Sequence, residues 1–570
     1  MRVDRLMIRN FRNLADIDIP LLPGTVIVGE NRAGKSNLLY ALRLVLDPRL
    51  PNSDRVLARE DFWDGLSDGS TTWDPMAAGE EIIVSVEMTD FEDDDNVVAV
   101  LSDCIDPASS PMRAKITYRF GPDDSDPPSA ATYSWGICGG LLADQPMPGD
   151  LRKYLGLAYL GALRDVESDL LNWRKSPLRP LLIATAEQVK EEELERIGKA
   201  VQTANEQVSA LEPVRDLGNR ISSRTAEMVG GSQALETELS IASQDPLRLL
   251  RTLRMYVDGE ARRPLASASL GSLNVLYLAL LELLLDQRAA SLDEAHTVLE
   301  IEEPEAHLHP HLQRLIFKRL LHSDVANRTV LLTTHSPHIV SVAQPRSLVV
   351  LRPDGTKTRA YVASHAQLDE ADWLDIERYF DATRAELAFA KRVLLVEGYA
   401  EQVIIPAIAR SLGLNLDKVG VTVCAIHGTH FTPYVKLCEA LGIPWSVITD
   451  GDPGEKGKKA GDDRKQAIID CLPTDRKSDA SAQIAVGDST LEYDVYRASL
   501  DNVESYKRVL GELCGPQVSK RVAEWDNPSC DDVLAAIKNG GGKGRFAQRL
   551  AQEKIAAPDY VAAVLQLLAP

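Results

Sequence analysis

The sequence has no hydrophobic run long enough to cross a membrane. Its most apolar stretch, residues 275–285, is about half the length of a membrane span and contains Glu282, so a buried helix is expected there. The first residues mix Arg and Asp with apolar side chains and lack the apolar centre of a secretory signal. These absences predict a cytoplasmic protein without a membrane segment.

Paired cysteines are also missing. The seven cysteines are scattered along the chain, and none forms a Cys-x-x-Cys pair. This pattern argues against a disulfide framework or a cysteine zinc site and favours a reducing compartment.

Basic charge is in deficit, since 63 Lys and Arg face 84 Asp and Glu and give a net charge of -21. A nucleic acid is therefore expected to bind only at local basic patches or through metal ions.

The chain is long, with 570 residues of which 44% are hydrophobic and 26% charged. That balance predicts an ordered protein of several domains.

A glycine-rich loop follows an apolar strand expected at residues 25–28. Residues 29–36 read Gly-Glu-Asn-Arg-Ala-Gly-Lys-Ser and fit the pattern GxxxxGK[ST], and apolar residues at helical spacing follow from Ser36. In this pattern backbone N–H groups cradle phosphate, the lysine reaches the terminal phosphates, and the serine hydroxyl meets Mg²⁺. The loop predicts an ATP site formed by Gly29, Asn31, Gly34, Lys35, Ser36 and Asn37.

Two further strand ends carry polar groups that suit this site. Residues 298–301 are apolar and lead into Glu302-Glu303-Pro304-Glu305, where the first carboxylate can hold Mg²⁺ with Ser36 and the second can orient the attacking water. Residues 330–334 are another expected core strand, and it ends at His335, which can reach the γ-phosphate. Zinc is disfavoured at His307, His309 and His311, because Pro310 interrupts their spacing and no cysteine is near.

A second α/β unit is expected from residue 388. The buried strand at residues 392–396 is followed by Glu397, and the strand at residues 446–449 ends in Asp450-Gly451-Asp452. Carboxylates at the carboxyl ends of adjacent parallel strands converge in one crevice. Such a cluster repels itself unless a divalent cation neutralises it, so Mg²⁺ or Mn²⁺ is predicted. Further carboxylates that could support a second ion are Glu401, Glu492 and Asp494.

Three other segments leave alternatives open. Residues 180–245 are rich in Glu, Lys, Ala and Gln and predict a helical insertion, which is either a solvated helical pair or a self-association element. Residues 456–459, with Arg464 and Lys465, form a basic cluster that suits a nucleic-acid backbone or is a solvated charge run. Residues 538–545 predict a flexible basic loop before a helix from Phe546.

The motifs of the nucleotide site resemble the ABC-type ATPases of the SMC and RecF group. Glu397-Gly398 and Asp450-Gly451-Asp452 resemble the two motifs of the TOPRIM domain of topoisomerases, primases and OLD nucleases. The residues at 302–310 and 334–337 are similar to the corresponding motifs of the OLD (overcoming lysogenization defect) family, and the resemblance spans most of the chain. It implies an α/β fold: an ABC/SMC-like P-loop ATPase with a helical insertion, followed by a TOPRIM α/β domain. The expected domains are an N-terminal ATPase segment at residues 1–165, a dimerising insertion at 166–245, a C-terminal ATPase segment at 246–375 and a TOPRIM nuclease domain at 388–570.

The resemblance also implies residue roles. Glu302 would be the Walker B acid, Glu303 the hydrolytic glutamate and His335 the switch histidine. Ser269-Leu270-Gly271 would be a signature segment that contacts ATP on a partner subunit, although it lacks the full LSGG pattern. Because Glu302 stands where Asp is more usual, ATP turnover is expected to be slow or regulatory. In the TOPRIM domain, Glu397 would be catalytic, and Lys543 would stabilise phosphoryl charge or contact the DNA backbone.

The function implied is a cytoplasmic, ATP-binding DNA endonuclease with Mg²⁺ or Mn²⁺ at both sites, hydrolysis by two metal ions, and a homodimer or higher homo-oligomer. One alternative is the nuclease subunit of a Gabija-like antiphage system, which requires a UvrD-like helicase. Another is a RecF-like ATP-dependent DNA-binding repair protein without nuclease activity. The additional Glu401 and Glu492 favour cutting.

Overall fold

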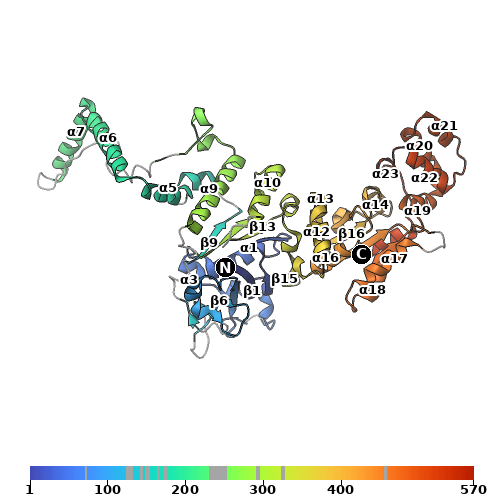
Figure 1. Ribbon diagram of the computed structural model, residues 1–570, viewed down its shortest axis with the longest axis horizontal. Coiled ribbons are helices and arrows are strands. Elements are labelled where there is room, and N and C mark those ends of the chain that lie inside the picture. The colour runs from blue at the N-terminus through green and yellow to red at the C-terminus, as the bar shows by residue number, and fades with distance from the viewer. Residues whose placement is uncertain are drawn as a thin grey trace. The chain divides into compact units, whose positions relative to one another are not determined.

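The computed structural model describes residues 1–569 except 71–72, 124–131, 141–144, 148–153, 163–165, 173–175, 230–252, 254, 291–294, 323–327 and 455–458 (Figure 1). The chain forms two compact units. Unit 1 contains Met1–Gly161, Ala295–Glu305 and His309–Pro570, and unit 2 contains Ala162–Glu294 with Ala306–Leu308. The boundaries of the four domains expected from the sequence remain predictions.

An antiparallel sheet begins unit 1. Its strands run in the order β2-β1-β4-β6-β7-β8, with β5 paired to β6. They are β1 (Arg2–Phe11), β2 (Leu14–Pro20), β4 (Ile82–Thr89), β5 (Ile105–Asp106), β6 (Arg113–Pro122), β7 (Tyr133–Gly139) and β8 (Gln145–Pro146). Short helices α2 (Asn52–Arg55) and α3 (Asp95–Val100) lie in its connections.

A second sheet of unit 1 carries the phosphate loop. Its order is β15-β14-β3-β13-β12-β9, and all neighbouring pairs are parallel except the β14–β15 hairpin. The strands are β3 (Gly24–Gly29), β9 (Leu155–Leu160), β12 (His296–Glu302), β13 (Arg328–Thr333), β14 (Leu348–Asp354) and β15 (Lys357–Val362). Because β3, β13 and β12 are parallel neighbours, the segments that follow them meet at one edge of the sheet.

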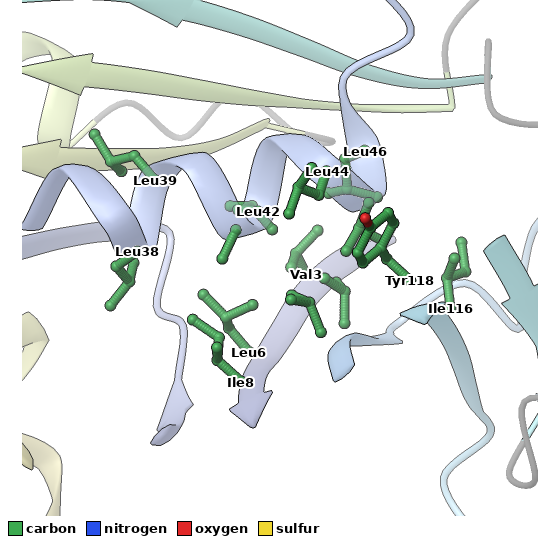
Figure 2. Close-up of a cluster of buried hydrophobic side chains, with 14 of the residues drawn as sticks. Val3, Leu6, Ile8, Leu38, Leu39, Leu42, Leu44, Leu46, Ile116 and Tyr118 are labelled. Carbon is green, nitrogen blue, oxygen red and sulfur yellow. The ribbon is translucent and has the colours of Figure 1, made fainter. Parts of the chain in front are cut away.

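Helix α1 (Lys35–Leu46) follows the phosphate loop, one residue earlier than the sequence predicts. It buries Leu38, Leu42 and other apolar side chains against strands of the antiparallel sheet, where Val3, Leu6, Ile116 and Tyr118 face it (Figure 2). This core fixes the helix that starts at Lys35. Four further helices of unit 1 come before its C-terminal sheet: α10 (Pro310–Leu321), α11 (Pro337–Val340), α12 (Glu370–Tyr379) and α13 (Ala382–Ala385).

Unit 2 is almost entirely helical in its described residues, and helices were expected in its segment 180–245. It contains α4 (Val166–Leu171), α5 (Leu178–Glu187), α6 (Glu191–Ser209), α7 (Glu212–Val229) and α9 (Leu270–Ala290), with a short hairpin of β10 (Tyr256–Val257) and β11 (Arg263–Pro264). Most of the predicted insertion beyond residue 229 lies outside the described residues. Helix α9 confirms the helix expected at residues 275–285, but its burial is one-sided because Leu283 is 55% exposed.

By length and composition alone, one described helix passes the test for a membrane span. It is the stretch Leu270–Arg288 of α9, and 33% of that stretch is buried.

The C-terminal region of unit 1 has its own parallel sheet, in the order β17-β16-β18-β19. The strands are β16 (Arg392–Val396), β17 (Val421–Ala425), β18 (Trp445–Thr449) and β19 (Ile484–Val486). Around it lie α14 (Tyr399–Ser411), α15 (Leu416–Val419), α16 (Thr432–Ala440), α17 (Ala460–Asp470), α18 (Lys477–Gln483), α19 (Leu491–Ala498) and α24 (Asp559–Leu568). Strands β16 and β18 are neighbours, so Glu397 and Asp450 leave adjacent strand ends.

A helical group completes this region, formed by α20 (Val503–Leu513), α21 (Pro516–Ala523), α22 (Cys530–Asn539) and α23 (Lys543–Leu550). The prediction of a flexible basic loop at residues 538–545 before a helix from Phe546 is wrong. Helix α23 begins at Lys543, and only three glycines, of which Gly541 and Gly542 have φ of 95° and 92°, separate it from α22. Lys543 is therefore held at a helix start rather than on a mobile loop.

Candidate functional sites

The phosphate loop between β3 and α1 is held by its surroundings. Gly34 has φ of 94°, and a Cβ there would lie 2.7 Å from Nδ2 of Asn13. Asn13 in turn accepts from Asn37 Nδ2 at 2.8 Å and donates to Thr358 Oγ1 at 2.8 Å. A side chain at residue 34 would displace the side chain of Asn13 and break these hydrogen bonds, so glycine is required. No sequence motif marks Asn13 as part of this site, and its only signal is its place just after an alternating strand.

Lys35 lies at the centre of the nucleotide site. Its side chain is 6% exposed, and Nζ donates to the carbonyl of Gly29 at 3.1 Å and lies 2.8 Å from Nε2 of His335. Burial lowers the pKa of Lys35, and the acids that follow β12 oppose that shift. A cavity of about 420 Å³ at this loop is lined by Asn31, Gly34, Lys35, Ser36, Asn37 and Glu303 among others. Of the residues predicted to form the ATP site, all but Gly29 line this cavity.

Glu302 ends β12 and meets Ser36, as the sequence predicts for a shared Mg²⁺ site. Its Oε1 accepts a hydrogen bond from Ser36 Oγ, and its Oε2 accepts one from Tyr159 at 2.5 Å. Tyr159 comes from β9, the edge strand beside β12, and no sequence pattern indicated its role. The guanidinium of Arg43 lies 4.2 Å above the Tyr159 ring, which ties α1 to the same group.

Glu303 and His335 meet next to Lys35. Glu303 has φ of 43°, and its Oε1 lies 3.2 Å from Nε2 of His335 and 3.9 Å from Lys35 Nζ. Glu305, to which the sequence analysis gave no role, accepts from the backbone N–H of His335 at 2.6 Å and from Thr334 Oγ1 at 2.8 Å. The third acid of the Glu-Glu-Pro-Glu run therefore positions the histidine loop.

Changing Glu303 to Gln is expected to leave ATP binding intact and to slow hydrolysis by at least about tenfold, because the amide keeps the shape but cannot take a proton from water. Nucleotide binding and phosphate release are to be measured separately. Glu377→Gln, at an exposed glutamate of α12, serves as the control and should hydrolyse ATP as wild type. Hydrolysis by Glu303→Gln at the wild-type rate would contradict this role.

The signature segment lies in unit 2. Ser269 precedes α9, and its Oγ accepts from the backbone N–H of Ser272 at 3.2 Å. A Cβ on Gly271 would lie 2.7 Å from the carbonyl oxygen of His307, so the helix start packs tightly on that segment. The contact of Ser269 and Gly271 with ATP of a partner subunit remains a prediction.

At the second site, Glu397 binds its neighbours at the end of β18. Its Oε1 accepts from the backbone N–H of Asp450 at 2.8 Å and from Thr449 Oγ1 at 2.5 Å. Asp450 Oδ1 accepts from the N–H of Leu491, which brings the start of α19 and Glu492 to the same edge. The convergence expected from parallel strand ends is therefore present.

Arg464 has a different place from the one expected. Its Nη2 lies 2.9 Å from Asp452 Oδ2 and 3.3 Å from Glu397 Oε1, so it is built into the carboxylate cluster. Lys465 donates to the carbonyls of Ser481 and Ile484, and Lys459 pairs with Asp488 at 2.8 Å. The described members of the predicted basic cluster thus serve the fold, while 456–458 lie outside the described residues.

Lys543 enters the cluster from the first residue of α23. Its Nζ lies 2.8 Å from Oε2 of Glu492 and 3.7 Å from Oδ2 of Asp450. Burial lowers the pKa of Lys543, but Glu492 and Asp450 outweigh it and raise the pKa above its usual value. The ammonium is therefore charged and is directed at the carboxylates.

Glu401 and Asp494 differ in their surroundings. Glu401 is buried on the first turn of α14, and burial followed by the nearby carboxylates raises its pKa. Asp494 is also buried, but its Oδ2 accepts from the N–H of Asp488 at 2.9 Å and from Tyr560 at 3.0 Å. These contacts give Asp494 a structural role in the turn before α19, and the prediction that it binds a metal has no support from its contacts.

The carboxylate cluster offers oxygen atoms, the ligand type that Mg²⁺ and Mn²⁺ prefer. Both carboxylate oxygens of Glu492 are buried, and no hydrogen bond of regular geometry reaches them from the described residues. Within the described ranges of the chain, no three acidic, histidine or cysteine side chains are gathered as closely as the ligands of an ion. Because Lys543 lies against Asp450 and Glu492, the cluster has an internal counter-charge that an ion would supplement or displace.

Metal binding at this site is expected to release a proton at low pH. Burial is the largest cause that raises the pKa of Asp450 to about 7; Lys543 opposes the shift, and the neighbouring carboxylates add to it. Since the pKa is raised, Asp450 is mostly protonated at pH 6 and ionised at pH 8.5. Calorimetry of Mn²⁺ binding in buffers of different ionisation enthalpy should show release of about one proton per ion at pH 6 and close to none at pH 8.5. Equal proton release at pH 6 and pH 8.5 would contradict this prediction.

Two known sequence families match parts of the chain. The family described as AAA ATPase domain matches residues 1–126 and 163–340, which is more than half of the chain. The family described as Overcoming lysogenization defect protein-like, TOPRIM domain matches residues 389–452, the segment from before Glu397 to Asp452.

Similar proteins span most of the chain. A Thermus scotoductus protein named OLD nuclease is 26% identical over 517 residues, which cover 83% of this chain and 89% of that protein. Endonuclease GajA of Bacillus cereus is 24% identical over 474 residues, which cover 80% of this chain and 76% of that protein. The solved C-terminal region of the Burkholderia pseudomallei OLD protein is 31% identical and covers 32% of this chain and 98% of its own, with a TM-score of 0.28. The chain therefore belongs to the OLD family and joins an AAA-type ATPase domain to an OLD-like TOPRIM domain.

Proposed function

We propose that this protein is an ATP-binding, metal-dependent DNA endonuclease. The observation that carries the proposal is the group of carboxylates at the edge of the β16–β18 pair with the charged ammonium of Lys543 beside it. An acidic cluster that also holds a cation is suited to bind divalent ions and a phosphate together. Relatives named as nucleases, which cover four fifths of the chain or more, support the same activity.

In this proposal Glu397, Glu401, Asp450, Asp452 and Glu492 would hold Mg²⁺ or Mn²⁺. When bound, a pair of such ions activates water and stabilises the leaving oxygen in displacement at phosphorus. Arg464 fixes the orientation of Glu397 and Asp452 by ion pairs. Lys543 neutralises negative charge that develops on the phosphoryl oxygens, which its place between Asp450 and Glu492 allows.

The nucleotide site would act as the regulator of cutting. Lys35 binds the terminal phosphates, Ser36 and Glu302 would hold Mg²⁺, and Glu303 directs water while His335 meets the γ-phosphate. The contact between His335 and Glu303, at 3.2 Å, supports this assignment of roles.

The deciding experiment is incubation of the purified full chain with supercoiled plasmid and Mg²⁺ or Mn²⁺. Nicked or linear DNA should form, and EDTA should prevent it. The variant Glu397→Gln, which keeps the side-chain volume, should leave the plasmid intact while ATP hydrolysis continues. Plasmid that stays supercoiled with every divalent ion and with or without ATP would favour the non-cutting, RecF-like alternative.

A Gabija-like role is the second candidate, because endonuclease GajA covers 80% of the chain in alignment. In that case a UvrD-like helicase would be encoded beside the gene and would bind this protein. For both candidate functions we place this protein in the cytoplasm, where DNA and ATP are available.

The protein is also proposed to work as a dimer or larger assembly. A signature segment that acts on a partner's ATP requires two chains. Helices α6 and α7 carry exposed apolar side chains that a second copy would cover, among them Ile197, Leu217 and Met228. Light scattering at micromolar concentration should give at least twice the chain mass, and Leu217→Glu should lower it. A strict monomer with and without ATP would overturn this assembly.

A further inference from the structure

A second pocket lies beside the carboxylate cluster, between α14 and α23. It has a volume of about 420 Å³, within the range of about 300–1,000 Å³ in which proteins enclose small ligands. Its lining includes Tyr399, Arg545, Gln548 and Arg549 together with apolar Val403 and Leu513. None of these lining residues has been given a role in ATP binding or in the carboxylate cluster.

The ring of Tyr399 is held in place at the pocket. Gln548 Nε2 donates to the Tyr399 hydroxyl at 2.6 Å, and a Cβ on Gly544 would lie 3.1 Å from Cδ1 of the ring. Gly544 thus allows the ring to lie against the first turn of α23. The side chain is nevertheless 46% exposed, so a face of a fixed aromatic ring is open to a ligand.

Two arginines of α23 add positive charge to the same pocket. Arg545 and Arg549 are exposed, and neither forms an ion pair with a residue in the described ranges. In a chain with a net charge of -21, two cations without acidic partners beside an open aromatic ring are suited to an anionic ligand that also has a ring.

The pocket is joined to the carboxylate cluster by its two helices. Tyr399 follows Glu397 by two residues, and Arg545 follows Lys543 by two residues, each at a helix start. The same two helices therefore carry residues of both the carboxylate cluster and the pocket.

We propose that this pocket binds a nucleotide of single-stranded DNA next to the phosphate that is cut. The base stacks on Tyr399, and Arg545 and Arg549 bind the adjoining backbone phosphates. In a duplex both faces of a base are covered by its neighbours, so only an unpaired or extruded base can use the ring. The inference rests on the proposed nuclease function and narrows its substrate to DNA with an unpaired segment.

The test is binding of labelled oligonucleotides to the full chain in EDTA, so that cleavage does not interfere. Wild-type protein should bind a single strand more tightly than the matching duplex. Tyr399→Ala and Tyr399→Leu should weaken single-strand binding by about 5- to 100-fold, the effect of losing one aromatic stacking contact. Tyr399→Phe should keep it, because the ring remains. Duplex binding should change little in all three.

Two further variants keep the test decisive. Arg549→Ala, at an exposed residue whose loss leaves the core intact, should weaken binding and reduce its dependence on salt by about one phosphate contact. Tyr379→Ala removes a tyrosine that is 48% exposed outside the pocket and should bind as wild type. Unchanged single-strand binding by Tyr399→Ala, or equal loss for strand and duplex, would overturn the inference. Plasmid cutting by wild type reports separately on the nuclease function.

Discussion

Replacing Lys35 by alanine is expected to abolish ATP binding. The side chain is almost fully buried at the end of the phosphate loop, and its ammonium is within 4 Å of Glu303 and in contact with His335. Alanine removes the cation that the loop directs at the terminal phosphates. It also leaves the carboxylates of Glu302 and Glu303 facing those phosphates without a counter-charge, so the loss is larger than that of one ion pair.

Equilibrium binding of a fluorescent ATP analogue measures the effect, and no saturation is expected at millimolar nucleotide. The matched control is Lys318→Ala, which removes an exposed lysine of α10 and should bind ATP as wild type. Plasmid cutting by Lys35→Ala then reports how far ATP governs access to the second site. Normal ATP affinity in Lys35→Ala would remove the phosphate loop from the nucleotide site.

Glu492→Ala is expected to reduce DNA cleavage by at least about a hundredfold, the order of effect of losing a group that supports a metal. Glu492 is buried, and its carboxylate contacts Lys543 at 2.8 Å. The alanine variant would lose a proposed metal ligand and would also free Lys543 from its partner, so both the ion and the ammonium would be misplaced. Cleavage is to be followed with Mg²⁺ and with Mn²⁺.

Two further variants serve as controls for the Glu492→Ala measurement. Glu504→Ala removes an exposed glutamate of α20 and should cut as wild type. Glu492→Gln keeps the volume of the side chain but not its charge, and it should be as inactive as the alanine variant if charge is what matters. ATP hydrolysis should survive in each. Cleavage by Glu492→Ala at the wild-type rate would contradict the proposal of a second metal ion. It would leave the assignment of the TOPRIM fold unaffected.

The sequence alone determined the features that depend on residues close together in the chain. The phosphate loop, the strand before it and the helix after it follow from residues 25–46, and the acidic strand ends at Glu302, Glu397 and Asp450 follow from apolar runs that stop at carboxylates. Parallel strands need no further information to bring such ends to one edge. Helices α6 and α7 were likewise expected from the composition of residues 180–245.

Only the tertiary structure decided which distant side chains complete each site. Tyr159 reaches Glu302 because β9 pairs with β12, and Arg464 joins Glu397 to Asp452 although it reads as a surface cation. Lys543 gained a fixed place because α23 starts there, while Asp494 turned to Tyr560. These contacts join segments separated by many residues, and a local pattern carries no signal of them: burial of a charge is decided by the partner that packing supplies.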